Sequence, residues 1–423
     1  MSDAPRAEKH APGFLAGARL FTPGIWLCFA AVFSLQFGGY GLYGVVFNLF
    51  LRRLGYPVTL IGLANAAAAI GAGVSAIPAG SLGVRWGSRS VVGFGLLAAA
   101  VFASLVPLAA YCPPALGTVV VIVAYGLFGA MGMAVGVNVV PFLANGATPA
   151  TRSSVFTVYG AVTPAGQFLG SAAGGVAPGL AAGILGVSLD RPDPYAWALW
   201  TVPVVMLVCG IWFLRLSGTG GEGTATSGPT KGRPPFALFL AFAASNGLRD
   251  AAGFATGIFF SLYLDVTFAV RVAVIGTLFA FSRVLPVAAT ALIPVLTRRF
   301  DRLVLIVVLS AGCAVLTLPA GLVASVAAAT VSLVGITTLN VMAIPIFASY
   351  SQDVSPREWR PLMNGFCGAV DAVSLVAMSF GGGFVVQAIG YRPLFLLSAC
   401  LTLLSAPVLW IPLRRGWRVS AAS

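Results

Sequence analysis

No Asp, Glu, Lys or Arg occurs in residues 90–151, which read SVVGFGLLAAAVFASLVPLAAYCPPALGTVVVIVAYGLFGAMGMAVGVNVVPFLANGATPAT. A helix needs about 20 apolar residues to cross a bilayer, so this run is too long for one crossing. It must turn back on itself, and Cys112-Pro113-Pro114 predicts the turn because proline interrupts helical hydrogen bonding. The stretch therefore predicts two antiparallel membrane helices joined by a short loop.

The whole chain has the same character. Of its 423 residues, 59% are hydrophobic and only 8% are charged, which is more apolar surface than a soluble globular protein can bury. No ten-residue segments of alternating hydrophobicity indicate a membrane β-barrel. The sequence predicts an all-α membrane protein with twelve spans, at residues 25–50, 58–83, 90–111, 115–140, 153–180, 195–216, 236–264, 271–297, 302–322, 325–350, 361–388 and 392–413.

The basic residues predict the topology. With the N-terminus inside, five of them lie outside, two lie within the membrane, and 17 lie inside: Arg6, Lys9, Arg19, Arg85, Arg89, Arg152, Arg215, Lys231, Arg233, Arg298, Arg299, Arg302, Arg357, Arg360, Arg414, Arg415 and Arg418. Cytoplasmic loops carry the excess of Lys and Arg, so we expect both termini in the cytoplasm and the chain in the inner (plasma) membrane. The same bias accounts for the net charge of +13, so we infer no nucleic-acid partner.

The longest polar stretch, residues 217–235, has the composition of a flexible linker. It divides the chain into five predicted parts: a cytoplasmic tail (1–24), a six-helix bundle (25–216), the cytoplasmic linker (217–235), a second six-helix bundle (236–413) and a cytoplasmic tail (414–423). The bundles resemble each other, because residues 61–86 align with 275–300 at an offset of 214. Two such pseudo-symmetric repeats are one known transporter design, with the binding site between them near the midplane.

Twelve spans, a 6+6 repeat and a long central linker resemble the major facilitator superfamily (MFS) over nearly the whole chain. Residues 80–89, GSLGVRWGSR, are similar to the family's loop after the second span, although Val84 replaces its acidic residue. The resemblance implies a latch that joins the two halves on the cytoplasmic side, formed by Gly80, Arg85, Gly87, Arg89, Arg299 and Asp301. Alternatively, Arg85 and Arg89 serve only to set the topology.

The family's drug–proton antiporters often carry an Arg and a Gln in the fourth span. In this chain, Tyr125 stands at the matching Arg position and Phe128 at the matching Gln position. That coupling device is therefore missing. The loop patterns of the family's sugar porters are missing too, which argues against a hexose carrier.

Across residues 20–214 every charged residue falls in a loop, whereas the second half carries four charged residues deep inside its predicted spans. Arg249 and Asp250 lie in the seventh span, Arg283 in the eighth and Asp371 in the eleventh. Because charges in a bilayer are costly and usually functional, two interpretations stay open. One is a buried ion network that only fixes helix packing. The other is a transport site, in which an Arg binds an anion and an Asp carries a proton.

The transport interpretation assigns roles. Asp371 is the predicted proton coupler, with Asp250 second, because Asp371 has no charged neighbour in sequence. Arg249 and Arg283 are predicted to bind substrate, with Asn246 on the polar strip next to Arg249 and Asp250. Arg283 is alternatively the ion-pair partner of one Asp.

The first half supplies neutral polar groups. Gln36, Asn138 and Tyr125 lie within its spans and are further candidates for substrate contact, although buried amides often only join helices. An aromatic wall is also predicted, from Tyr40, Tyr43, Tyr125, Phe128, Phe156 and Tyr159. Aromatic residues on membrane helices also serve as packing groups or interface anchors.

These features predict a secondary active transporter that moves a small organic molecule by alternating access, driven by protons. Export of amphipathic compounds by antiport is the leading expectation, and uptake of an organic anion is the alternative. A membrane sensor and an intramembrane enzyme are weaker hypotheses. The only histidine is His10, the cysteines are isolated and no phosphate-binding loop occurs. We therefore expect no metal, no cofactor, no catalytic residue and no direct use of ATP, in a protein that works as a monomer.

Overall fold

The structure is a computed structural model that describes residues 21–148, 151–216, 236–355 and 359–414. The predicted linker (217–235) and most of the two predicted tails lie outside the described residues. The described part is helical, with no strand. Twelve of its helical segments are long and apolar enough to cross a membrane, as the sequence predicted.

The first half consists of six spans, and its first span changes from α-helix to π-helix and back. Its elements are α2 (Pro23–Leu35), the π-helix η1 (Gln36–Leu42), α3 (Tyr43–Arg53), α4 (Val58–Trp86), α5 (Ser88–Leu108), the 3₁₀ turn η2 (Ala109–Tyr111), α6 (Pro114–Gly146), α7 (Arg152–Leu185) and α8 (Asp193–Leu216). The turn predicted at Cys112-Pro113-Pro114 is confirmed, because α6 begins at Pro114.

The second half contains six more spans, two of which are built from two helices. Its elements are α9 (Phe236–Arg249), α10 (Ala251–Phe268), α11 (Val272–Thr290), α12 (Ile293–Arg299), α13 (Arg302–Leu322), α14 (Val326–Val354), α15 (Arg360–Ile389) and α16 (Tyr391–Arg414). The predicted eighth span, 271–297, is interrupted after Thr290. Pro294 stands in the first turn of α12, where its missing amide proton costs no hydrogen bond.

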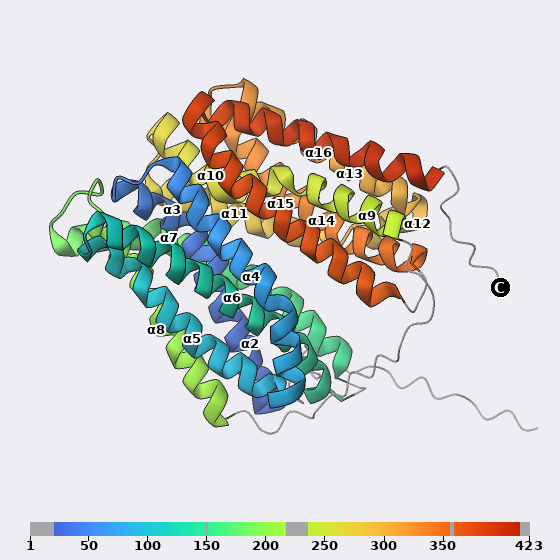
Figure 1. Cartoon of the computed structure of the whole chain (residues 1–423), viewed down its shortest axis with the longest axis horizontal. Helices are drawn as coiled ribbons and strands as arrows, with labels where there is room; N and C mark the ends of the chain where they lie inside the picture. Colours follow the sequence, from blue (N-terminus) through green and yellow to red (C-terminus); the bar gives the residue numbers. More distant parts are fainter. Residues whose placement is uncertain (1–20, 149–150, 217–235, 356–358, 415–423) are drawn as a thin grey trace, which may run out of the picture.

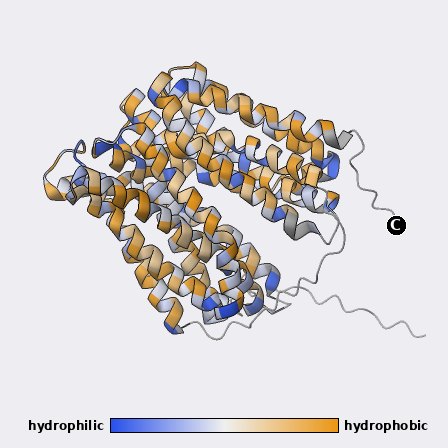
Figure 2. Ribbon diagram, in the orientation of Figure 1, coloured by the Kyte–Doolittle hydropathy of each residue, from blue (hydrophilic) through white to orange (hydrophobic). Residues whose placement is uncertain are grey.

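The helices form two bundles that meet at one end and diverge toward the other (Figure 1). Packing between the bundles occurs mainly where α4 contacts α15, α7 contacts α11 and α3 contacts α10. We call the joined end, which carries Gly55, Leu189 and Ala269, the closed end, and the opposite end the open end. Figure 2 shows hydrophobic residues along the helices and hydrophilic residues gathered mainly near their ends.

Small residues allow the bundles to touch at the closed end. A Cβ placed on Gly276 of α11 would lie 2.3 Å from the Cα of Gly175 on α7. A Cβ placed on Gly62 of α4 would lie 2.3 Å from the carbonyl oxygen of Ser379 on α15. Since real side chains cannot approach so closely, these two glycines permit backbone-to-backbone contact between the halves.

Candidate functional site

The first span loses its α-helical hydrogen bonding in the middle. Residues 36–42, QFGGYGL, form the π-helix η1, a rare feature that often marks functional sites. A Cβ on Gly170 of α7 would lie 2.1 Å from the carbonyl oxygen of Phe37, so α7 packs directly on this irregular backbone. Gln167 of α7 donates a hydrogen bond from Nε2 to Oε1 of Gln36 at 2.9 Å.

The seventh span is also broken in the middle, between α9 and α10. Asp250 stands at the break, with α9 ending at Arg249 and α10 beginning at Ala251. Thr402 of α16 satisfies the freed backbone groups. Its Oγ1 accepts from the amide of Ala252 at 3.1 Å and donates to the carbonyl of Arg249 at 3.3 Å. A break inside a membrane span is tolerated when a neighbouring helix supplies such partners.

The two irregular positions are equivalent in the internal repeat. Gln36 and Asp250 are 214 positions apart, which is the offset that relates the second and eighth spans. Each lies next to a polar contact with the fifth span of its own bundle. In the first bundle this contact joins Gln36 to Gln167, and in the second it joins Asn246 to Asp371. The first repeat thus joins two neutral amides here, whereas the second joins an amide to a carboxylate.

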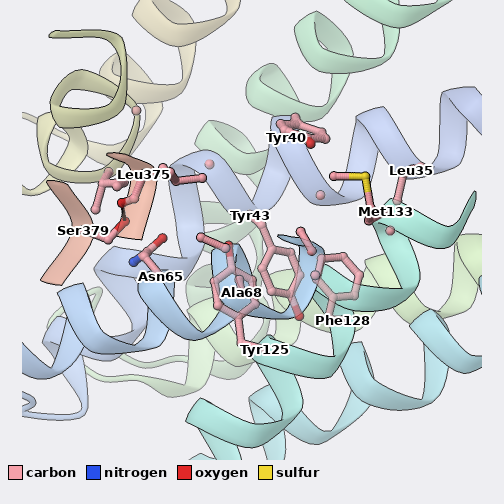
Figure 3. A pocket seen from close by; sticks show the side chains of 18 of the residues that line it. Leu35, Tyr40, Tyr43, Asn65, Ala68, Tyr125, Phe128, Met133, Leu375 and Ser379 are labelled. Carbon is pink, nitrogen blue, oxygen red and sulfur yellow. Dashed lines mark hydrogen bonds between the residues drawn. The ribbon is translucent and has the colours of Figure 1, made fainter. Parts of the chain in front are cut away.

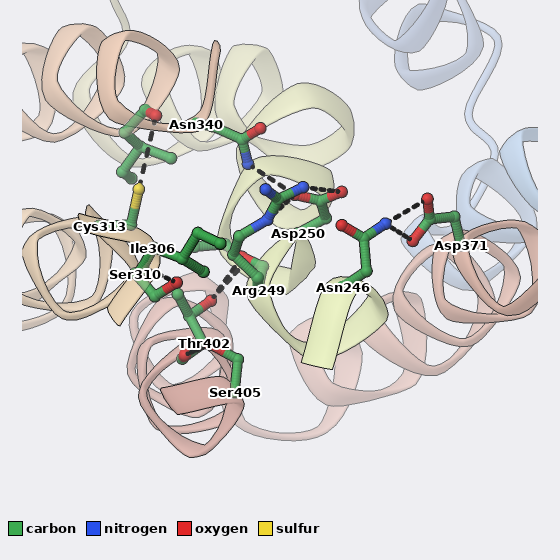
Figure 4. Close-up of polar contacts among 12 residues, drawn as sticks. Asn246, Arg249, Asp250, Ile306, Ser310, Cys313, Asn340, Asp371, Thr402 and Ser405 are labelled. Atoms are coloured by element: carbon green, nitrogen blue, oxygen red, sulfur yellow. Dashed lines mark hydrogen bonds and ion pairs between the residues drawn. The ribbon is translucent and has the colours of Figure 1, made fainter. Parts of the chain in front are cut away.

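Arg249 and Asp250 form an ion pair at the break (Figure 4). Arg249 Nη2 lies 3.0 Å from Asp250 Oδ1, and the Arg249 side chain is only 3% exposed. Asn340 of α14 donates to the same carboxylate oxygen at 3.1 Å, and the guanidinium lies over the ring of Phe347, 5.1 Å from its centroid. The pair is therefore enclosed within the second bundle.

Asp371 is held by an amide and by no cation. Asn246 Nδ2 lies 2.6 Å from Oδ1 and 2.5 Å from Oδ2 of Asp371, which joins α9 to α15 (Figure 4). Asp371 takes part in none of the ion pairs of the described residues. The sequence analysis placed Asp371 in one group with the other three intramembrane charges. In the structure its side-chain hydrogen bonds come from Asn246 instead.

A cavity of about 360 Å³ lies between the bundles. Its first-bundle wall comes from α2, η1, α3, α4 and α6, and its second-bundle wall from α10, α11 and α15. This volume falls in the usual range for small-molecule sites. Among the described residues that line it, Arg283 is the only charged one.

Aromatic rings form one wall of this cavity. Tyr43, Tyr125 and Phe128 lie close together, with Asn65 and Ser379 to one side of them (Figure 3). The ring of Tyr43 is stacked near those of Tyr125 and Phe128, at centroid distances of 5.7 and 5.2 Å. Of the six residues predicted to form an aromatic wall, Tyr40, Tyr43, Tyr125 and Phe128 line the cavity.

Arg283 forms no ion pair with any residue that the structure describes. Within the described part of the chain its Nε is buried without a hydrogen-bond partner, and it belongs to no salt bridge. Two roles were predicted for Arg283, substrate binding and ion pairing with an Asp. The structure does not show the ion pair. Its place in the cavity wall suits the other role, binding of an anionic group.

The other predicted substrate contacts divide into two groups. Gln36 and Tyr125 line the cavity. Asn138 is 2% exposed and donates to the carbonyls of Ala79 and Ala134 at 3.0 and 2.9 Å, so it joins α4 to α6 and does not line the cavity. Asn246 and Arg249 are also outside its lining.

The predicted latch residues lie at the open end and do not join the bundles in this conformation. Arg89 donates to the carbonyl of Leu214 within its own bundle. Asp301 caps α13 by accepting from the amide of Leu303 at 2.8 Å. Arg85 and Arg299 are exposed, and neither takes part in the salt bridges of the described residues. Gly87 lies between α4 and α5 with a φ of +82°, and Gly80 is near the end of α4.

Sequence reasoning missed an ion pair that joins the bundles at the closed end. Arg53, the last residue of α3, donates from Nη1 and Nη2 to the two carboxylate oxygens of Asp265 on α10, both at 2.8 Å. Its Nε also donates to the carbonyl of Leu189 at 3.1 Å. The sequence feature that could have predicted this pair is that Arg53 and Asp265 lie near the ends of equivalent spans, the first and the seventh.

The sequence model of the family described as Major Facilitator Superfamily matches residues 28–366. No curated protein matches the chain. Among solved structures, a bacterial homologue of the human lysosomal transporter Spinster, in an inward-facing and occupied conformation, has 12% identity and a TM-score of 0.74, covering 94% of this chain and 98% of that one. The nucleoside transporter NupG has 13% identity and a TM-score of 0.72, covering 92% and 99%.

A further solved structure, the xylose transporter XylE from E. coli in an inward open conformation, has 15% identity and a TM-score of 0.67, covering 91% of this chain and 95% of that one. At such identities the likeness shows the fold alone, whereas the family match spans most of the chain. The chain therefore belongs to the Major Facilitator Superfamily, and it is a multi-pass membrane protein with the fold of a secondary transporter and not of an enzyme.

Proposed function

We propose that this chain is a proton-coupled transporter of an amphipathic organic anion, which binds in the cavity between the bundles. The observation that carries the proposal is Arg283, the only charged residue in the described cavity lining, which has no ion-pair partner there. Arg283 is half-buried, and a cation without an ion-pair partner is costly within a membrane. An anionic substrate would supply that partner, and the aromatic wall would hold its apolar part.

Asp371 is the proposed proton carrier. It lies one helical turn from Leu375 and two turns from Ser379, and both of those residues line the cavity. Residues spaced by four share one helix face, so Asp371 lies on the face of α15 that continues from the cavity. An anion that enters the cavity would repel the ionised carboxylate and favour uptake of a proton. Anion and proton would then bind together, which favours symport.

The distribution of basic residues supports an orientation. The open end carries the Arg-rich segments around Arg85 and Arg299, so the positive-inside rule makes it the cytoplasmic end. The described conformation then faces inward, with both termini in the cytoplasm and the chain in the plasma membrane. Symport down the proton gradient would make the protein an importer of the anion.

Export of amphipathic compounds by proton antiport is the second candidate. The cavity favours it in one respect, because most of its lining is aromatic, aliphatic or glycine. Such a surface accepts neutral molecules as well as anions. For a neutral or cationic substrate, competition with a proton on Asp371 would give antiport.

The experiment is to reconstitute the protein into liposomes that contain a pH-sensitive dye, and to add naphthalene-2-sulfonate outside. This anion stays ionised and does not cross the bilayer as a neutral acid. We expect the lumen to acidify, and we expect Arg283→Gln to remove the signal. Asp371→Asn should lose acidification while retaining exchange of labelled for unlabelled sulfonate. Luminal alkalinisation would instead indicate antiport, and no sulfonate movement would refute the proposal.

A further inference from the structure

We propose that the transported anion carries an aromatic ring, which stacks against the wall formed by Tyr43, Tyr125 and Phe128 while its acidic group binds Arg283. This inference rests on the proposed function and specifies its substrate class. It has two parts that can be tested separately: a ring site on the first bundle, and an anion site on the second.

The ring site follows from a shared orientation of three side chains. The ring planes of Tyr43 and Tyr125 differ by 13°, those of Tyr43 and Phe128 by 20°, and those of Tyr125 and Phe128 by 12°. Phe47 supports them, with its centroid 3.9 Å from that of Tyr125. Offset stacking between rings depends on such near-parallel planes. A planar ligand that stacks on the exposed part of this wall would lie nearly parallel to all three rings, which a puckered saturated ring cannot do.

The tyrosine at the centre of the wall is fixed. Tyr43 is 1% exposed, and its hydroxyl donates to the carbonyl of Ala103 at 3.2 Å. The hydrogen bond and the burial therefore fix the position of this ring, and its neighbours stack on a preorganised surface. Preorganisation of this kind reduces the entropy lost when a ligand binds.

Glycines leave room for a flat molecule beside this wall. Gly44, Gly136 and Gly257 line the cavity, and a Cβ added to any of them would meet no heavy atom within 4 Å. Gly44 and Gly136 belong to the first bundle and Gly257 to the second. The free space therefore continues from one bundle to the other.

The anion site lies across that space. Arg283 on α11 belongs to the second bundle, whereas Tyr125 and Phe128 on α6 belong to the first. The planar guanidinium matches a carboxylate or sulfonate through paired hydrogen bonds. A ligand with a ring at one end and an acid at the other would contact both bundles at once.

The test is equilibrium binding to the full-length protein in detergent, with matched probes. Naphthalene-2-sulfonate has ring and charge, decahydronaphthalene-2-sulfonate keeps the charge and approximate size without aromaticity, and naphthalene-2-methanol keeps the ring without charge. We expect the aromatic sulfonate to bind about threefold to tenfold more tightly than the saturated one. Phe128→Leu should reduce that preference, because it removes one of the three rings and weakens the binding of the aromatic sulfonate more than that of the saturated one.

Phe142→Leu is the matched control. Phe142 is on the same helix, is 4% exposed and packs on Phe213 rather than on the cavity, so it should keep the preference for the aromatic probe. Monodispersity on size exclusion checks that each variant is folded.

The outcomes separate the two proposals. Equal binding of the two sulfonates would overturn the ring site while leaving the proposed function intact. Equal binding of the sulfonate and the alcohol, unchanged in Arg283→Gln, would overturn the anion site and with it the proposed function. Loss of the aromatic preference in Phe142→Leu to the same degree as in Phe128→Leu would also overturn the ring site.

Discussion

Arg53 and Asp265 join the two bundles through two parallel hydrogen bonds, each 2.8 Å long, at the closed end of the molecule. Their side chains are 19% and 10% exposed. Arg53 also lies over the ring of Tyr195, 5.6 Å from its centroid. In alternating access the bundles must separate at this end when the other end closes, so this ion pair has to break in each transport cycle.

Asp265→Asn should therefore shift the protein toward the conformation that is open at this end. The loss of a partly buried, two-point ion pair is worth about 1–3 kcal/mol, roughly a tenfold change in the equilibrium for each 1.4 kcal/mol. Spin labels at Ser188 and Arg271 would report the change as a longer distance between the bundles.

Arg191→Gln is the control for that measurement. Arg191 pairs with Asp193 inside the first bundle, and its side chain is 63% exposed. It should leave the distance distribution unchanged. Equal distributions for the wild type and Asp265→Asn would show that the ion pair does not hold the closed end.

Arg249 and Asp250 should behave as one unit. Arg249→Met leaves a buried carboxylate without its cation, and we expect a loss of about 3–5 kcal/mol in stability. The double variant Arg249→Met/Asp250→Asn should regain much of the lost stability, because it no longer buries an unpaired carboxylate. The melting temperatures of the four proteins form a double-mutant cycle. Additive effects of the two substitutions would contradict the pairing.

The same cycle separates the two interpretations of this cluster. A stable double variant that retains sulfonate exchange in liposomes would show that the pair serves helix packing. A stable double variant without exchange would show that the pair takes part in transport.

Thr402→Val should weaken the broken seventh span. Valine has nearly the shape of threonine but cannot bond the Ala252 amide or the Arg249 carbonyl. Buried backbone groups left without partners cost about 1–3 kcal/mol, which thermal unfolding in detergent would measure. Thr317→Val is the matched control, because Thr317 is equally buried but bonds only the Cys313 carbonyl of its own helix. Equal losses in both variants would argue against a special role for Thr402.

Gly257→Val should block the cavity. The added side chain points into free space that the ligand needs, so we expect naphthalene-2-sulfonate to bind at least about tenfold more weakly. Gly179→Val is the control, because Gly179 also has no heavy atom near its added Cβ but does not line the cavity. Unchanged binding in Gly257→Val would place the ligand elsewhere.

The spans were predictable because each depends on an apolar run of sufficient length, whatever its neighbours. The turn at Cys112-Pro113-Pro114 and the twelve spans follow from that requirement alone. The resemblance of residues 61–86 to 275–300 predicted more than the spans. It indicated the internal repeat, and the repeat indicated a cavity between two bundles.

Side-chain partners were less predictable because they depend on how the helices pack. Neighbours on a regular helix point about 100° apart, so adjacency did not predict that Arg249 pairs with Asp250. They meet because the helix ends between them and a new one begins. The Asn246–Asp371 contact joins residues 125 positions apart, and the Arg53–Asp265 pair joins the two bundles. Neither follows from local pattern.

Gln36 and Asp250, which occupy equivalent positions in the two halves, differ in charge. Both spans have an irregular backbone at this position, the first as a π-helix and the second as a break. The first half carries an amide there, and the proposed function assigns to this half the aromatic wall of the ligand site. The second half carries charge there, and the proposed function assigns to it anion binding and proton coupling. Under the proposed function, substitutions that alter the preference for a ring should therefore lie mainly in the first half, and those that alter energy coupling should lie mainly in the second.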